Sequence, residues 1–234
     1  MTAPVFIAGH SLGAGEAEEC AFDRVKRGLP VDGVYVIGSP RPGNSVLGTA
    51  LSKVPVWRSI QNRVGPHFPD YDLVTSVPFE AGPLFDYSQI APFELIAEPA
   101  APNDTWGLFR YHHSFLYQAG VQKLSPTSSG AAVELTEAVD AIQDLYGGPG
   151  YAAHDKAAPA GRWDVPNFVD GQFWGMRIMP NGARLVVFRG STTRLDWWHD
   201  FEFGQIDLHG AKVSAGFWQG VGASLGALDA ALAA

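Results

Sequence analysis

A serine set between two glycines is the first pattern in the chain that could do chemistry. The sequence GHSLG at positions 9–13 has the form G-x-S-x-G, and the apolar run at 5–8 before it predicts a buried strand. Residues from 14 onward favour a helix. In such a strand-to-helix turn the glycines permit close backbone approach, and the serine hydroxyl is exposed beside the N–H groups of the helix. Ser11 is therefore the candidate nucleophile.

A serine nucleophile needs a base beside it and a carboxylate to orient that base. Two of the seven histidines, His112 and His113, lie at the start of a helix predicted over 110–123. Adjacent residues point in different directions, so only one of the pair can face Ser11. We expect the side chain of His10 to point away from the reacting centre into the packing.

Six aspartates follow the serine and precede these histidines, the chain order that this kind of site usually has, and four of them are candidates for the acid. Asp70 and Asp72 lie in a polar, proline-bearing loop after a predicted strand at 56–60, and Asp86 and Asp104 are more distant alternatives. For each of them the competing interpretation is a solvated loop residue. The residues alone leave the choice open.

Composition limits the other classes of function. The chain has 234 residues, 46% of them hydrophobic and 17% charged, and a net charge of −8, which suits one large globular domain or at most two small ones. No basic block is present, which argues against nucleic acid as a partner. Cys20 is the only cysteine, so no intramolecular disulfide can form, which favours a reducing compartment.

The sequence also lacks the usual signals for a membrane or a cofactor. We see no signal peptide and no apolar run long enough to span a bilayer, so we expect no integral membrane segment and, by default, a cytoplasmic location. There is no metal-ligand spacing and no phosphate-cradling glycine loop, so we expect no metal and no cofactor. Oligomeric state is not predicted.

The remaining pattern predicts an α/β protein with a mostly parallel sheet. Short apolar runs alternate with amphipathic stretches, and a small polar segment at 124–132 is typical of a linker. Helices are predicted at 14–28, 45–53, 110–123, 133–146, 194–200 and 215–233, strands at 34–37 and 56–60, an edge hairpin at 84–87 with 93–97, and an antiparallel hairpin at 173–179 with 184–188.

The order of these elements is unusual for a parallel sheet, in which a crossover element precedes each strand. The strand at 4–8 has nothing before it, and the helix at 215–233 leads into no strand. Joining the two ends of the chain would remove both anomalies. We therefore expect a circularly permuted order, with the two ends close together and the strand at 4–8 flanked on both sides.

Seven short segments then carry a resemblance to a known family. They are FRGS at 188–191, DWWHD at 196–200, KVSAGF at 212–217, GHSLG at 9–13, YVIGSPRPGN at 35–44, Asp72-Leu73-Val74 with Pro78, and His113 with Tyr117. Together they resemble the motifs of the class 3 lipases, the fungal triacylglycerol lipases and their relatives, in permuted order. Ser214 stands where the family usually has histidine.

The resemblance implies an α/β-hydrolase fold over 1–234, with an elbow half at 1–123 and an oxyanion-loop half at 133–234. It favours Asp72 as the acid, because Asp72 alone opens a D-x-V-x-x-x-P match. It favours His113, spaced to Tyr117, as the base, with His112, spaced to Phe115, as a competitor.

Two further roles follow from the same resemblance. The backbone N–H groups of Leu12 and Ser191 would hold the oxyanion, and Trp198 would line the cleft or a small lid. The expected function is a serine carboxylic-ester hydrolase, a lipase or esterase, that acts on a small ester or lipid through an acyl-enzyme. The alternatives are an acyltransferase or amidase with the same triad, and a non-catalytic interaction module that kept the fold.

Overall fold

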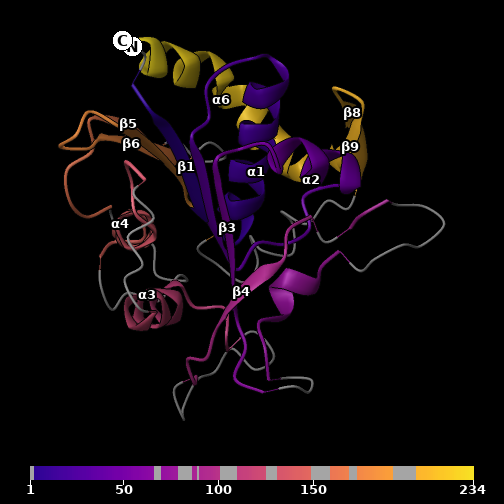
Figure 1. Cartoon of the computed structure of the whole chain (residues 1–234), viewed down its shortest axis with the longest axis vertical. Helices are drawn as coiled ribbons and strands as arrows, with labels where there is room; N and C mark the ends of the chain where they lie inside the picture. Colours follow the sequence, from indigo (N-terminus) through magenta and orange to yellow (C-terminus); the bar gives the residue numbers. More distant parts are fainter. Residues whose placement is uncertain are drawn as a thin grey trace.

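A seven-stranded mixed sheet forms the centre of the protein (Figure 1), in the order β4-β3-β2-β1-β7-β6-β5. The computed structural model describes residues 3–65, 70–78, 86–88, 90–100, 110–124, 131–148, 159–168, 173–191 and 204–234. The strands from β4 to β7 along the sheet run parallel, whereas β6 and β5 are antiparallel to their neighbours. The bounds are β1 Val5–His10, β2 Gly33–Ile37, β3 Val56–Asn62, β4 Phe93–Ile96, β5 Val165–Asn167, β6 Trp174–Ile178 and β7 Arg184–Phe188.

Strand β1 occupies the middle of the sheet because both of its faces are apolar. Val5 and Ile7 pack into one core, and Phe6 and Ala8 pack into the core on the opposite face. A strand buried on both sides reads as a continuous apolar run, as this one does. Its neighbours are β2 on one side and β7 on the other. The expectation that this strand is flanked on both sides is confirmed.

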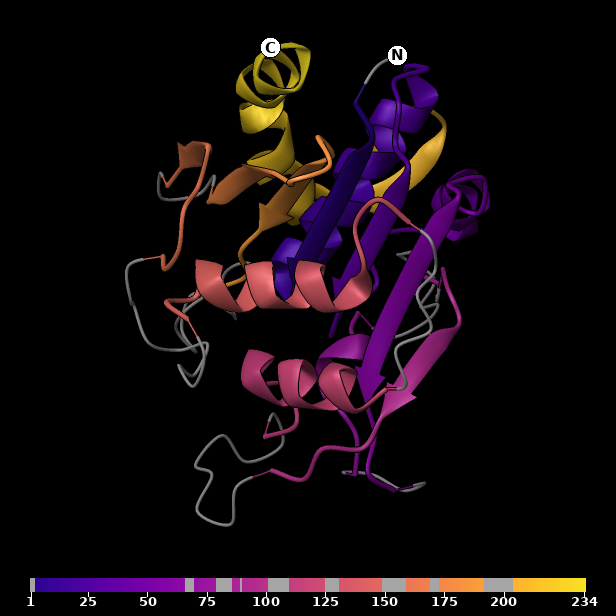
Figure 2. The same ribbon diagram turned by 60° about the vertical axis from the view of Figure 1, so that its left-hand side comes forward.

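Helices cover both faces of the sheet (Figure 2), which gives the α/β architecture that the pattern predicts. On one face α1 contacts both α2 and α6, and on the other α3 packs beside α4. A 3-10 turn, η1, and a separate two-stranded hairpin complete the described elements. The bounds are α1 Leu12–Lys26, α2 Ser45–Leu51, η1 Leu73–Ser76, α3 Ser114–Lys123, α4 Leu135–Leu145, β8 Gln205–Leu208, β9 Ala211–Ser214 and α6 Ala215–Ala233.

The first and last described segments lie together, as expected. The backbone N–H of Arg184 donates to the Pro4 carbonyl at 2.8 Å, and the guanidinium of the same residue donates to the Leu232 carbonyl. Asp229 of α6 also accepts hydrogen bonds from Arg24 and Arg27 at the end of α1. These contacts fix α6 beside α1 and beside the start of β1 (Figure 1).

Several predicted elements differ from the structure. The expected edge hairpin of 84–87 with 93–97 is wrong, because β4 instead pairs in parallel with β3. The helix predicted from residue 110 begins only at Ser114. The short strand β5 and the β8-β9 hairpin were not predicted. The helix predicted at 194–200 and residues 125–130 of the linker-like segment lie outside the described residues.

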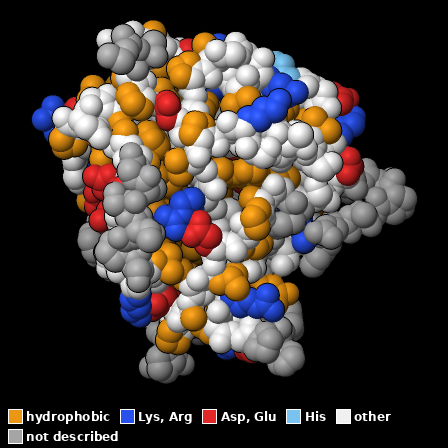
Figure 3. All heavy atoms as spheres, viewed as in Figure 1, with side chains coloured by type: hydrophobic (Ala, Val, Ile, Leu, Met, Phe, Trp, Pro, Cys, Tyr) orange, Lys and Arg blue, Asp and Glu red, His pale blue; other side chains and the backbone are white. Residues whose placement is uncertain are grey.

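No helix within the described part of the chain combines the length and the apolar character needed to cross a bilayer. The surface shown in Figure 3 carries lysine and arginine side chains in small separate groups, mixed with acidic ones. On the face drawn, the charged side chains therefore form no basic stripe of the kind that tracks a nucleic-acid backbone.

The glycines of the elbow make a first test possible. A Cβ on Gly13 would lie 2.4 Å from the Phe188 carbonyl oxygen, which belongs to the β7 backbone. We expect Gly13→Ala to lower the free energy of unfolding by about 2 kcal/mol, because overpacking against backbone has no flexible side chain to yield. Urea denaturation measures the change.

Gly226 in α6 is the matched control, because a Cβ there would meet no atom within 4 Å. Gly226→Ala should raise the free energy of unfolding by roughly 0.5–1 kcal/mol through helix propensity. Equal effects of the two substitutions would contradict the close approach of α1 to β7.

Candidate active site

Ser11 sits in the strained turn that the glycine spacing predicts. Its backbone has φ 60° and ψ −130°, a conformation that a non-glycine residue rarely adopts. A Cβ on Gly9 would lie only 2.0 Å from the Gly13 carbonyl oxygen, so the turn requires glycine there. The Ser11 N–H donates to the Ile37 carbonyl at 3.2 Å, and its side chain makes no capping bond to α1. Strain of about 1–3 kcal/mol is typical of functional positions of this kind.

The structure buries Asp72 completely at the start of η1. Its N–H donates to the Asn62 carbonyl at the end of β3, and its Oδ1 accepts the Val74 N–H at 3.0 Å. Its Oδ2 accepts two more bonds, from the Tyr117 hydroxyl and from Nδ1 of His112 at 2.7 Å. Three donors thus stabilise a carboxylate that water does not reach.

The other candidate acids are placed differently. Asp70 is half-buried in the preceding loop, where its carbonyl accepts the Val64 N–H. Asp86 is exposed and accepts a hydrogen bond from the Asn44 amide. Asp104 lies outside the described residues. Of the three candidate acids that the structure describes, Asp72 alone pairs with a histidine.

His112 is the histidine that meets this acid. A carboxylate only accepts, so Nδ1 of His112 carries the proton that is donated to Asp72. In the neutral ring, Nε2 then holds the lone pair that a general base needs. The His112 ring is 2% exposed and stacks on His10 with 4.6 Å between ring centroids. Since His10 directly precedes Ser11, this stacking brings His112 beside the elbow.

The end of β2 leaves room for the acid and the base. A Cβ on Gly38 would lie 2.9 Å from both Asp72 Oδ2 and His112 Cε1, and Gly38 has a left-handed φ of 57°. Ile37, the residue before it, accepts the Ser11 N–H. The serine, the histidine and the aspartate therefore lie at the ends of neighbouring parallel strands, the edge where ligands bind in open α/β sheets.

The predicted pairing of Asp72 with His113 is wrong. His113 is the N-cap residue of α3, and its ring stacks on Phe115 with 5.1 Å between centroids. The predicted helix included both histidines, but the helix begins only after them, and His112, the residue before the cap, is the one that donates to Asp72. Tyr117 is nevertheless part of the site, because its hydroxyl donates to Asp72. Burial, followed by the charge of Asp72, raises the pKa of Tyr117 and keeps that donor protonated.

The bend after β7 lies against the elbow, as predicted. A Cβ on Gly190 would lie 2.5 Å from the His10 carbonyl oxygen and 2.7 Å from Ser11 Cβ. Leu12 is the first residue of α1, so its N–H belongs to the helix turn that faces this point. Ser191 follows Gly190 directly, and its role as the second oxyanion donor stays a prediction. Trp198 lies outside the described residues.

Two buried glutamates on α1 were not singled out by the sequence. Glu18 accepts a 2.6 Å hydrogen bond from Ser39, and Glu19 accepts the Ser214 N–H at 3.0 Å. Burial raises the pKa of Glu18 to about 8 and raises that of Glu19 well above its ordinary value. Both glutamates lie on α1 about two helical turns after Ser11. The helix that begins at the elbow therefore also carries two buried acids.

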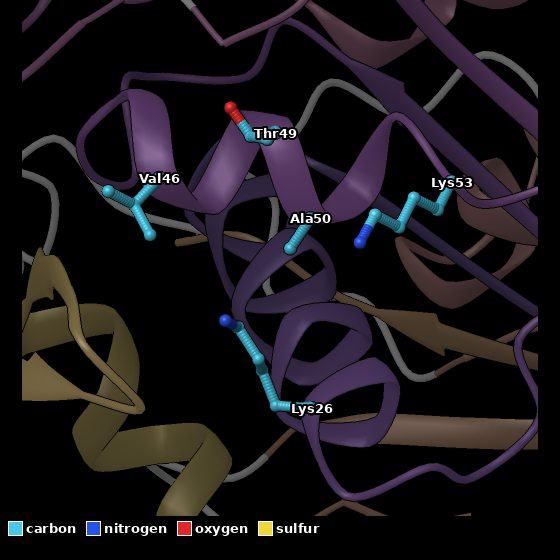
Figure 4. A pocket seen from close by; sticks show the side chains of 5 residues that line it. All are labelled: Lys26, Val46, Thr49, Ala50 and Lys53. Atoms are coloured by element: carbon cyan, nitrogen blue, oxygen red, sulfur yellow. The ribbon is translucent and has the colours of Figure 1, made fainter.

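A surface hollow elsewhere on the protein does not compete with this site. It is lined by Lys26, Val46, Thr49, Ala50 and Lys53, and Figure 4 shows the two lysines flanking it between α1 and α2. Lys26 is the last residue of α1, about 22 Å along that helix from the elbow. Among the described residues, no three His, Cys, Asp or Glu side chains are grouped as a metal site would need.

Glu18 gives the protein a stability that depends on pH. Its pKa is raised from 4.5 to about 8, so between these values the folded state keeps a proton that the unfolded chain has lost. The free energy of unfolding should therefore decrease as pH rises through this window, by roughly 1 kcal/mol per pH unit from this group.

In Glu18→Gln this contribution disappears, because the amide does not titrate. Urea unfolding at pH 5, 6, 7 and 8 should show a shallower fall of stability in the variant. Parallel curves for the two proteins would contradict a protonated Glu18 in the native state.

No family model matches the chain, and a comparison with curated proteins also finds no match. The function must therefore be argued from the site itself.

Proposed function

We propose that the protein is a serine carboxylic-ester hydrolase of the lipase or esterase type. The observation that carries the proposal is the buried hydrogen bond from His112 to Asp72, which lies at the sheet edge where Ser11 occupies its strained elbow. A nucleophile, an oriented imidazole and a carboxylate without access to water are the parts that acyl transfer through serine requires. The three groups come from three separate loops, whereas a polar cluster formed by chance needs no such convergence.

The reaction would proceed in two halves. Nε2 of His112 takes the proton of Ser11 as Oγ attacks the ester carbonyl, and Asp72 stabilises the imidazolium that forms. The tetrahedral oxyanion is held by the N–H of Leu12 and that of Ser191. His112 returns the proton to the alcohol as it leaves. Water then attacks the acyl-enzyme and gives a proton to His112. As the bond between the acyl group and Ser11 Oγ breaks and the acid leaves, His112 passes that proton to Oγ and the Ser11 hydroxyl is restored.

The same proposal includes an α/β-hydrolase fold in circularly permuted order. Supporting it, the elbow follows the strand at the middle of the sheet, and the strand beside it, β7, comes from the far end of the sequence. The packing of Leu232 and Pro4 around Arg184 would let the two ends be joined without moving either element. In a relative without the permutation, the chain would run from α4 through β7 and α6 and then directly into β1.

Ser11 is the first residue to test. Ser11→Ala should lose at least about 10³-fold in turnover of a short-chain p-nitrophenyl ester, because no other group can form the acyl-enzyme. A fluorophosphonate probe should label the natural protein at Ser11 and leave the variant unlabelled, while both unfold at similar urea concentrations. A variant that kept its turnover, or a natural protein that the probe did not label, would count against the hydrolase.

The two histidines supply a matched comparison, since both are 2% exposed and adjacent in the chain. We expect His112→Gln to lose about 10³-fold or more in kcat, and His113→Gln to stay within about tenfold of the natural protein. Steady-state hydrolysis of the same ester measures both. The reverse order of effects would restore His113 as the base.

A series of p-nitrophenyl esters of increasing acyl length would define the substrate, since rates that rise with chain length favour a lipase. Added alcohol or an amide substrate separates the rival uses of the same triad. Faster transfer to the alcohol than to water would indicate an acyltransferase, and amide turnover would indicate an amidase.

A further inference from the structure

Two buried residues connect the oxyanion bend to the backbone of the base. Tyr146, the residue that ends α4, accepts the Gly190 N–H at its hydroxyl oxygen at 2.9 Å. The same hydroxyl lies 3.0 Å from Nδ1 of His10, and Nε2 of His10 lies 2.9 Å from the His112 carbonyl oxygen. The path therefore crosses from the bend after β7, through α4 and the last residue of β1, to the segment before α3.

Only one arrangement of protons satisfies every bond in this path. A carbonyl oxygen can only accept, so Nε2 of His10 carries the proton. In the neutral ring Nδ1 must then accept, so the Tyr146 hydroxyl donates to it. The hydroxyl oxygen keeps a lone pair for the Gly190 N–H. Each donor thus faces an acceptor from one end of the path to the other.

The surroundings of both side chains hold this arrangement in place. His10 and Tyr146 are each 0% exposed. Burial is the main cause that lowers the pKa of His10 well below its ordinary value, and the repulsion that arises when His112 is protonated adds to it, so the His10 ring is neutral at neutral pH. Burial raises the pKa of Tyr146, so its hydroxyl stays protonated. Buried polar chains that are fully satisfied in this way stiffen the structure around them.

We propose that Tyr146 and His10 are positioning residues that hold the oxyanion bend and the base in register with each other. The inference rests on the proposed function, because it gives the Gly190–Ser191 backbone and His112 roles in one reaction. Neither residue touches the reacting atoms: Tyr146 fixes the peptide that precedes the Ser191 N–H, and His10 fixes the His112 backbone. An oxyanion donor has to lie about 2.7–3.1 Å from the oxyanion, and a misplacement of about 1 Å can cost 10²-fold in rate.

The test compares two buried tyrosines. Tyr146→Phe keeps the ring and removes the hydroxyl, whereas Tyr35→Phe removes a buried hydroxyl that donates to the Val133 carbonyl at 2.6 Å. We expect Tyr146→Phe to lower kcat about 10- to 100-fold with KM changed less than about threefold, because the lost contact acts on the transition state. Tyr35→Phe should reduce stability and leave both constants unchanged.

The affinity for a mimic of the transition state is a measurement that should not change if Tyr146 has only a structural role. Butylboronic acid, which forms a tetrahedral adduct with a serine hydroxyl, should bind Tyr146→Phe more weakly by the same factor as kcat/KM falls. Equal kcat and boronate affinity in the two tyrosine variants would overturn the positioning role. If Tyr146→Phe does not fold, His10→Phe takes its place, because it keeps an aromatic ring and removes both the donor to the His112 carbonyl and the acceptor for Tyr146; the same criteria apply.

The proton arrangement can be read without any activity. In the ¹⁵N-labelled protein at pH 7, correlations between ring nitrogens and carbons should show His10 as the neutral tautomer protonated at Nε2. A proton on Nδ1, or a charged ring, would overturn the inference even if esters are hydrolysed. A natural protein that neither hydrolyses esters nor reacts with a fluorophosphonate would instead remove the proposed function, and the positioning role with it.

Discussion

The site depends on direct contact between the elbow and the backbone of β7 and its bend. Glycines at 9, 13 and 190 lie where a Cβ would come within 2.5 Å of a backbone oxygen. The elbow and the bend can therefore touch main chain to main chain at the ends of β1 and β7. This contact fixes where the N-terminus of α1 points, and it places the 188–191 bend beside Ser11. Without it, the nucleophile and the proposed Ser191 oxyanion donor would belong to separate parts of the protein.

The buried polar groups around this contact fall into two kinds. Asp72 receives three donors from different elements, which offset the cost of burying its charge. Glu18 and Glu19 accept fewer hydrogen bonds, and burial raises their pKa values. The acid proposed for catalysis is thus surrounded by donors suited to a charged group. Glu18 and Glu19, which lie on the helix after the elbow, are therefore protonated over part of the neutral pH range.

The two strands at the centre of the sheet, β1 and β7, come from opposite parts of the sequence. The strand pair β1 and β7 joins the start of the sequence to its last third, and α6 returns to cover α1. Contacts between such distant segments form only after a large loop is closed, so local propensity alone cannot assemble the site. The arrangement also means that both halves of the sequence are needed before Ser11 has a neighbour on each side of its strand.

Local pattern in the sequence determined the elbow, the apolar strand before it, and the β6-β7 hairpin with its Pro180-Asn181-Gly182 turn. These follow from short-range rules: the steric demand for glycine, the short apolar run, and turn chemistry. The residues alone left the acid open, and Asp72 was expected only through the resemblance to the class 3 lipases. Tertiary structure decided between His112 and His113, because a shift of a few residues in the helix start changes which ring faces the acid. It also decided the parallel pairing of β4 and the contact of Tyr146 with Gly190, since the partners lie elsewhere in the sequence and local spacing carries no signal for them.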